Sequence, residues 1–238
     1  MEYINAKNIV IKTKSTSWFG TDYNMNLYRG CNYGCIYCDS RSKCYKIENF
    51  ESVKVKENAL MIVRDDLRRK GKKGIIGMGA MSDPYNCLEK SLNLTRNSLE
   101  LINAYGFGVS IVTKSNLILR DLDILKDIKG HSPVICKVTI TTTDDELAKK
   151  IEPNAPAPSI RLDAINQLSR NGIFVGVILM PVLPFITDTT VGMGSTCGLH
   201  WKLSYLSAGG VSGIPSVAVK CVDIRRNTSG EGGLLDGN

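Results

Sequence analysis

Short apolar runs alternate with amphipathic stretches along residues 24–186 of the chain. The apolar runs are rich in β-branched residues, and they predict five strands, at 24–29, 74–79, 107–113, 133–141 and 173–180. Between these runs, apolar residues recur at spacings of three and four. This period predicts helices at 59–70, 88–105, 119–130, 144–151 and 158–172. Asp144 is suited to cap one of these helices, and Pro158 is suited to open another.

Strands that alternate with helices indicate an α/β fold with a parallel sheet and right-handed crossovers. Binding sites in such sheets lie at the carboxyl ends of the strands. Four polar or thiol-bearing segments follow predicted strands, and we expect them to converge at this edge; they are residues 30–38, 80–85, 114–115 and 142–144.

The pattern stops after about Thr187. Residues 188–238 hold ten of the 22 glycines and show no sustained helical or strand period. We therefore expect a core domain at 1–187 and an aperiodic, glycine-rich tail at 188–238. The tail is either a shifted reading frame, which would make a defective truncated product, or a genuine flexible extension.

Composition narrows the class of protein further. With 43% hydrophobic and 22% charged residues, the 238-residue chain resembles a soluble globular protein. The start, MEYINAKNIVIK, lacks the apolar core of a signal peptide, so we expect a cytoplasmic protein with no membrane partner. The net charge of +7 permits an anionic partner such as nucleic acid, but scattered surface lysines explain it equally well.

Three of the eight cysteines lie close together, as Cys31, Cys35 and Cys38. Thiolates are soft ligands that select zinc, copper(I) or iron–sulfur clusters. A structural zinc site needs four ligands, but the nearest further thiol, Cys44, stands at an unusual spacing. A [4Fe–4S] cluster held by only three cysteines keeps one iron open for a cofactor or substrate. We therefore expect Cys44 to have a structural role, or to lie next to the cluster ligands without binding the cluster itself.

The motif C-x3-C-x2-C, with the aromatic Tyr37 just before the third cysteine, resembles the signature of the radical S-adenosylmethionine (SAM) superfamily. The resemblance implies a [4Fe–4S] cluster on Cys31, Cys35 and Cys38, whose open iron chelates SAM. An electron from the cluster then cleaves the C5′–S bond and yields a 5′-deoxyadenosyl radical. It also implies an electron donor such as flavodoxin or ferredoxin, and it places Tyr37 beside the adenine.

Further segments, GMGAMSDPYNCLEK, TKSNLILRD, TITTTDDELAKKIEPNAP and GVILMPVLPF, resemble the spore photoproduct lyase-like branch over about residues 16–187. The fold implied is a partial (β/α)6 barrel of the TIM type, here without a proper sixth strand. By the same resemblance, Ser82 and Asp83 meet the SAM amino group, Lys114 pairs with its carboxylate, and Thr141 approaches the ribose. Purely structural alternatives also exist. Asp83 would then only form a turn with Pro84, Lys114 would be a solvated loop lysine, and Thr141 would be an ordinary strand residue.

One departure leaves the substrate unassigned. Where the lyase carries a hydrogen-donating cysteine, this chain has Ala80. DNA remains a possible substrate, and the alternatives are a peptide or small molecule, or a metal- or cluster-binding module without catalysis. A DNA substrate would need phosphate contacts, for which the basic candidates are Arg41, Lys43, Lys46, Arg68, Arg69 and Lys70.

Overall fold

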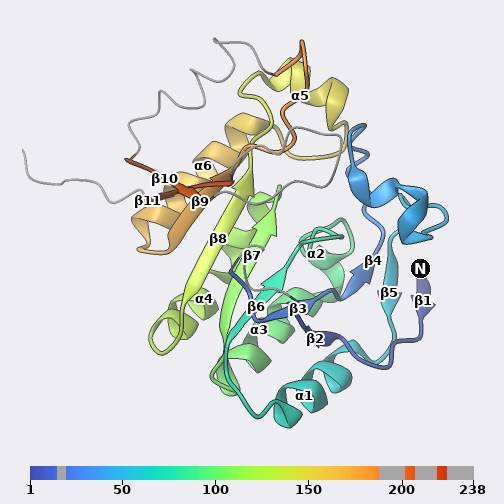
Figure 1. Cartoon of the computed structure of the whole chain (residues 1–238), viewed down its shortest axis with the longest axis vertical. Helices are drawn as coiled ribbons and strands as arrows, with labels where there is room; N and C mark the ends of the chain where they lie inside the picture. Colours follow the sequence, from blue (N-terminus) through green and yellow to red (C-terminus); the bar gives the residue numbers. More distant parts are fainter. Residues whose placement is uncertain (15–19, 188–201, 207–218, 224–238) are drawn as a thin grey trace, which may run out of the picture.

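The computed structural model of the chain describes residues 1–14, 20–187, 202–206 and 219–223 (Figure 1). Its strands form an eight-stranded sheet, in the order β10-β11-β9-β8-β7-β6-β3-β2, and a three-stranded sheet, in the order β1-β5-β4. The strands are β1 (Glu2–Ile4), β2 (Val10–Lys12), β3 (Tyr23–Met25), β4 (Tyr28–Arg29), β5 (Lys54–Lys56), β6 (Ile75–Met78), β7 (Gly108–Thr113), β8 (Val134–Thr139), β9 (Phe174–Ile178), β10 (Lys202–Leu206) and β11 (Val219–Asp223).

Five strands of the large sheet, β3, β6, β7, β8 and β9, run parallel to one another. They correspond to the five predicted strands, so the expected parallel sheet is confirmed. Side chains such as Val109, Ile111 and Val138 are fully buried, which agrees with the near-continuous apolar runs of these strands. The sheet is open, with edges at β2 and β10 among the described strands.

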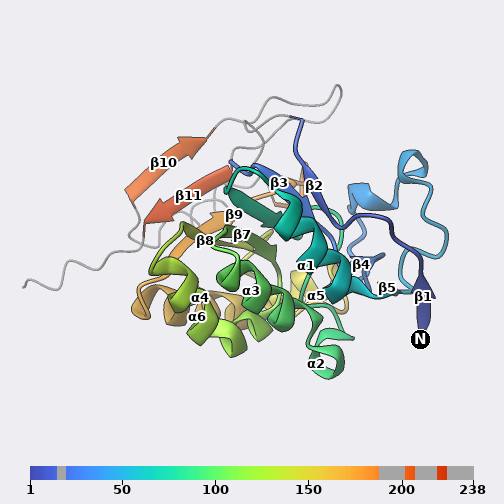
Figure 2. The ribbon, with the colours of Figure 1, turned by 90° about the horizontal axis from the view of Figure 1, so that it is seen from below.

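The helices lie mainly on one side of the large sheet, as Figure 2 shows for α1, α3, α4 and α6. Helix α3 contacts β7, α4 contacts β7 and β8, and α6 contacts β9. The helices are α1 (Ala59–Arg69), α2 (Glu89–Leu92), α3 (Leu94–Ala104), α4 (Leu122–Lys129), α5 (Asp145–Ile151) and α6 (Pro158–Arg170), with short 3-10 turns η1 (Asp39–Arg41), η2 (Lys43–Tyr45) and η3 (Asn116–Asp121).

The capping predictions are confirmed. Oδ1 of Asp144 accepts hydrogen bonds from the backbone amides of Glu146 and Leu147 at the start of α5. Pro158 stands in the first turn of α6, where its missing amide hydrogen costs nothing. These local signals set the starts of the two helices between β8 and β9.

Two predicted elements are divided in the structure. The strand expected at 24–29 splits into β3, in the large sheet, and β4, in the small sheet. The helix expected at 88–105 breaks at Asn93, whose φ of 52° lies in the left-handed region. The break is stabilised by the buried carboxylate of Glu89, which accepts hydrogen bonds from the amides of Thr95 and Arg96 at the start of α3.

The segment after residue 187 also differs from expectation, because it contributes β10 and β11. Strand β11 pairs antiparallel with β9, and β10 pairs antiparallel with β11. Among the described residues, β11 therefore takes the place beside β9 where a sixth parallel strand would lie. The rest of the expected aperiodic tail falls outside the described residues. Within the part of the chain described, no helix is long and apolar enough to cross a membrane.

Candidate cofactor site

Three of the four segments expected to converge meet at the carboxyl edge of the parallel strands, and Thr141, directly before the fourth, joins them. The hydroxyl of Ser82, after β6, donates a hydrogen bond to the backbone carbonyl of Gly30. The backbone amide of Lys114, after β7, donates to Oδ2 of Asp83 at 2.8 Å. The hydroxyls of Tyr37 and Thr141 lie 2.9 Å apart, which joins residues 30–38, hereafter the cysteine loop, to the end of β8.

The cysteine loop depends on a glycine at its start. Gly30 has a φ of +88°, and a Cβ atom added there would lie 2.5 Å from the backbone oxygen of Phe50. This close approach lets the amide of Cys31 donate a hydrogen bond to that same oxygen at 2.8 Å. Only glycine adopts such a conformation without strain.

The far side of the cysteine loop rests on the residues that end α5. The amide of Ile36 donates to the carbonyl of Ile151 at 3.0 Å, and the amide of Asn154 donates to the carbonyl of Tyr33 at 3.1 Å. The Asn154 side chain also donates to the carbonyl of Asn32 at 2.9 Å. A loop held by backbone bonds on both sides presents its side chains in one arrangement.

The three predicted cluster ligands differ in exposure. Cys35 is buried, whereas Cys31 and Cys38 are half-buried. Burial, reinforced by the negative charge of Asp83, raises the pKa of Cys31 to about 11. Burial also raises the pKa of Cys35, and the positive charge of Lys114 opposes that shift. The thiols therefore favour the protonated form until a metal supplies positive charge.

The other two cysteines near the loop are exposed. Sγ of Cys44 lies 2.6 Å from the hydroxyl of Ser42 in the segment that follows the loop. The amide of Cys87 donates to Oδ1 of Asn32 at 3.3 Å, so this residue lies beside the loop. Cys87 lies seven residues after Ala80, the position at which the resemblance to the lyase predicts a hydrogen-donating cysteine. Nothing in its contacts assigns it that role.

Asp83 is a buried carboxylate that already accepts several hydrogen bonds. Its Oδ1 accepts from the amide of Tyr85 at 2.9 Å and from the hydroxyl of Thr113 at 2.8 Å, and its Oδ2 accepts from the amide of Lys114. Burial raises the pKa of Asp83, and these hydrogen bonds oppose the shift. The side chain thus fixes the loop after β6 against the loop after β7.

Lys114 brings a positive charge to the same place. Its Nζ lies 5.6 Å from the centroid of the Tyr37 ring, a distance at which a cation is attracted to an aromatic face. The residue is half-buried, and its charge acts on Cys35 and Asp83. The cation therefore comes from a segment far along the sequence from the aromatic ring and the thiol, which both belong to the cysteine loop.

Beneath Tyr37 and Thr141 lies a buried pair that the sequence alone did not single out. Oε1 of Glu152 accepts hydrogen bonds from the hydroxyls of Tyr37 and of Thr141, the second at 2.8 Å. Its Oε2 accepts from the Arg161 guanidinium. Burial raises the pKa of Glu152, and the charge of Arg161 opposes the shift. In the sequence, Glu152 stands directly before a proline and nine residues before Arg161. This spacing is the signal from which the pair could have been predicted.

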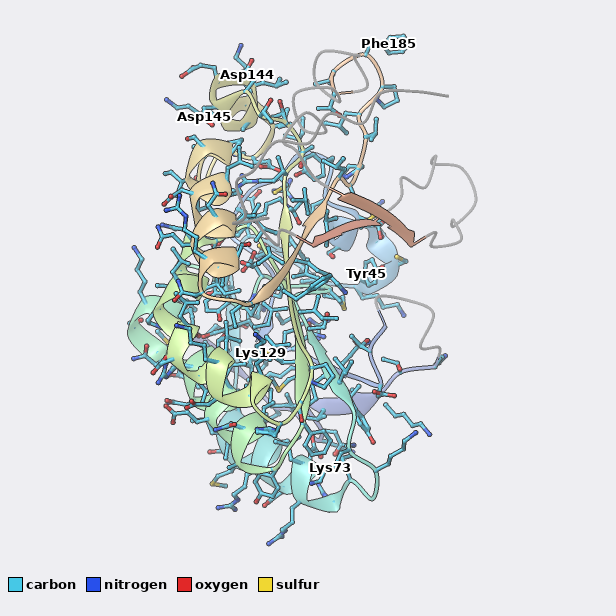
Figure 3. The ribbon with its side chains drawn as sticks, turned by 90° about the vertical axis from the view of Figure 1, so that its left-hand side faces the viewer. Tyr45, Lys73, Lys129, Asp144, Asp145 and Phe185 are labelled. Carbon is cyan, nitrogen blue, oxygen red and sulfur yellow. The ribbon has the colours of Figure 1, made fainter. Side chains whose placement is uncertain are left out.

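The basic residues considered for DNA binding fall into two distant groups. Arg41, Lys43 and Lys46 lie just after the cysteine loop, in or beside η1 and η2. Arg68, Arg69 and Lys70 end α1, next to Lys73, which Figure 3 shows at the opposite end of the molecule from Asp144 and Phe185. Of the two groups, the first is the one that directly follows the cysteine loop in sequence, and the second belongs to α1.

The sequence matches the Radical SAM superfamily over residues 25–193. It is 37% identical over 202 residues to an uncharacterized protein of Methanocaldococcus jannaschii, a match that covers 81% of this chain and 75% of that protein. It is 30% identical over 216 residues to an uncharacterized protein of Mycobacterium tuberculosis, covering 88% of this chain and 62% of that protein. The chain belongs to the radical SAM superfamily.

Solved structures of spore photoproduct lyase share its fold. One mutant superimposes with a TM-score of 0.57 at 16% identity, covering 75% of this chain and 50% of that chain. The lyase in complex with dinucleoside spore photoproduct gives a TM-score of 0.53 at 16% identity, over 76% of this chain and 52% of that chain. The partial α/β barrel is thereby confirmed. This chain spans about half the length of those lyase structures.

The donor set agrees with the cluster that the family implies. Three soft thiols stand on one rigid loop, and a cation and an aromatic ring lie beside them. In the part of the chain that the structure describes, no three His, Cys, Asp or Glu side chains converge as ligands of one metal ion. The agreement therefore rests on ligand chemistry, since a [4Fe–4S] cluster takes its cysteines on separate irons.

Proposed function

We propose that the chain is a radical SAM enzyme that cleaves SAM reductively at a [4Fe–4S] cluster held by Cys31, Cys35 and Cys38. The observation that carries the proposal is the meeting of this three-thiol loop with Lys114, Tyr37 and Thr141 at one edge of the sheet. A zwitterionic, adenosine-bearing cofactor needs a cation, an aromatic surface and polar groups at one place.

Each residue then has a defined task. The cluster, when bound, supplies the electron that cleaves the C5′–S bond of SAM. Lys114 pairs with the SAM carboxylate, and Asp83 holds the Lys114 backbone in place through the amide hydrogen bond. Ser82 and Asp83 face the amino group, Tyr37 lies beside the adenine, and Thr141 approaches the ribose.

The test is anaerobic reconstitution with iron and sulfide, followed by reduction with dithionite in the presence of SAM. We expect one [4Fe–4S] cluster per chain and release of 5′-deoxyadenosine with methionine. The matched control is Cys35→Ala, which should do neither. Zinc bound in place of iron would indicate a zinc module, and a cluster without SAM cleavage would indicate a non-catalytic cluster-binding module. Either result would overturn the proposal.

We further propose that residues 1–187 form the core domain that carries this chemistry, because every residue assigned a role lies within them. The electron would come from a small donor such as flavodoxin or ferredoxin. Such a protein, whose thiols must stay reduced to hold a cluster, fits a cytoplasmic location.

For the substrate we propose DNA, because Arg41, Lys43 and Lys46 lie beside the cysteine loop. If these residues contact phosphates, reversing all three to Glu should weaken binding to duplex DNA and lower its dependence on salt concentration. The matched control reverses Arg68, Arg69 and Lys70, at the end of α1. No DNA binding by the natural protein at low salt would favour a peptide or small-molecule substrate.

A further inference from the structure

Glu152 accepts hydrogen bonds from the hydroxyls of Tyr37 and Thr141, and it therefore determines where their protons point. Its side chain is 1% exposed, and it forms an ion pair with Arg161, whose side chain is 0% exposed. The guanidinium of Arg161 is held in turn, because it also donates to the carbonyls of Pro156 and Thr139. The carboxylate therefore occupies one fixed position below Tyr37 and Thr141.

The number of protons around Glu152 determines whether the site donates or accepts hydrogen bonds. An ionised carboxylate is acceptor-only, and each hydroxyl carries a single proton. Oε1 of Glu152 accepts from the hydroxyls of both Tyr37 and Thr141. The two hydroxyls also lie 2.9 Å apart, so one of them can donate to the other instead. In either case both protons are used within this group, and the two hydroxyl oxygens offer only lone pairs to a ligand on their other side. That ligand must donate hydrogen bonds.

We infer that Glu152 is a positioning residue that turns Thr141 and Tyr37 into hydrogen-bond acceptors for the adenosyl half of SAM. The inference rests on the proposed function. The adenosyl half supplies the donors that such a surface requires, namely the ribose hydroxyls and the exocyclic amine of adenine. The same segment also holds the cysteine loop, through the bonds of Ile36 to Ile151 and of Asn154 to Tyr33. The adenosyl site and the cluster ligands are therefore set by one short stretch of chain.

Glu152→Gln tests the inference because the amide reverses the polarity. Arg161 has only donors, so the single amide oxygen must face the guanidinium. The amide nitrogen then points at Tyr37 and Thr141 and donates to them. One hydroxyl can still donate to the other, 2.9 Å away, but the second must then turn its proton toward the ligand. The site changes from one that only accepts hydrogen bonds to one that also donates.

The experiment measures the affinity of the cluster-loaded protein for SAM and for its 2′-deoxy and 3′-deoxy analogues. In the natural protein, at least one analogue should bind about three- to tenfold more weakly than SAM, which is the loss of one hydrogen bond. In Glu152→Gln, SAM itself should bind more weakly, and the ratio between SAM and that analogue should fall close to one. A purely structural role would lower all three affinities and leave the ratios unchanged, and that result would overturn the inference.

Two further variants keep the test decisive. Thr141→Val removes one hydroxyl without disturbing the Glu152–Arg161 pair. It should bring the ratio of the affinities for SAM and for that analogue close to one, and this test holds even if Glu152→Gln folds poorly. Glu89→Gln is the matched control, because Glu89 is also fully buried and also bonds a tyrosine hydroxyl and an arginine, Tyr28 and Arg120. It should lower stability and leave the ratio as in the natural protein. If the natural protein binds no cluster or no SAM, the proposed function itself fails, and the inference fails with it.

Discussion

The hydroxyl of Ser82 donates a hydrogen bond to the backbone carbonyl of Gly30, 52 residues earlier in the chain. This bond ties the loop after β6 to the residue directly before Cys31. Ser82 is buried, so water does not compete for the bond. The start of the cysteine loop is thereby held from two sides, by Ser82 and by the carbonyl of Phe50, which accepts from the amide of Cys31.

Replacing Gly30 by Ala should disrupt this arrangement. The added Cβ would lie 2.5 Å from the Phe50 oxygen, at a φ of +88°. Both the clash and the left-handed backbone cost energy, together at least about 2 kcal/mol. We expect lower thermal stability and a clear loss of iron after reconstitution. The matched control is Gly106→Ala, with a φ of +69° and no atom near the added Cβ. Equal cluster contents in the two variants would contradict the prediction.

Loss of any one of the three loop cysteines should abolish the cluster. Cys31→Ala, Cys35→Ala or Cys38→Ala each removes one of only three protein ligands. Cys44→Ala should retain the cluster, since Cys44 is exposed and contacts Ser42. Iron and sulfide analysis, together with the visible absorption spectrum, measures both outcomes. A colourless Cys44→Ala protein would make Cys44 a ligand and would argue against an open iron.

Lys114→Ala should weaken SAM binding while leaving the cluster in place. A hydrogen bond to a charged group contributes about 1.5–3 kcal/mol, which corresponds to a fall in affinity of about 10- to 150-fold. Equilibrium dialysis with the reconstituted protein measures it. Lys129→Ala is the control, because Nζ of Lys129 donates to the carbonyl of Gly172, and both residues lie shortly before parallel strands, at the amino-terminal edge of the sheet. Unaltered affinity in Lys114→Ala would leave Lys114 as a solvated surface lysine.

The contribution of Asp145 to stability should depend on pH. Hydrogen bonds from the hydroxyl and the amide of Ser159 lower the pKa of Asp145. A carboxylate whose pKa is lowered by folding stabilises the fold above its unfolded pKa of about 4. That stabilisation is lost as the pH falls through the folded pKa. Urea unfolding at pH 7 should therefore show Asp145→Asn to be less stable than the natural protein.

The difference between the two proteins should narrow as the pH falls below about 4. Ser159→Ala, which removes one donor to Asp145, should reduce the pH dependence. A gap between Asp145→Asn and the natural protein that is constant from pH 7 to pH 3 would show that the charge of Asp145 does not contribute.

The sequence by itself determined the elements that depend on near neighbours. The five parallel strands follow from apolar runs, and the ends of α5 and α6 follow from Asp144 and Pro158, because periodicity and capping act within one or two turns. The three thiols of the cysteine loop are also close in sequence. Their carboxyl-edge position follows from the alternation of strands and helices.

Only the tertiary structure decided which distant residues meet. Tyr37 and Glu152 are 115 residues apart, and no local pattern links an aromatic ring in a cysteine loop to a carboxylate at the end of a helix. The break at Asn93 follows from the buried carboxylate of Glu89, and the short strands β1, β4 and β5 exist only as partners of one another. These features depend on burial and hydrogen bonding that arise when the chain packs, because a buried polar group must find its partner wherever the fold supplies one.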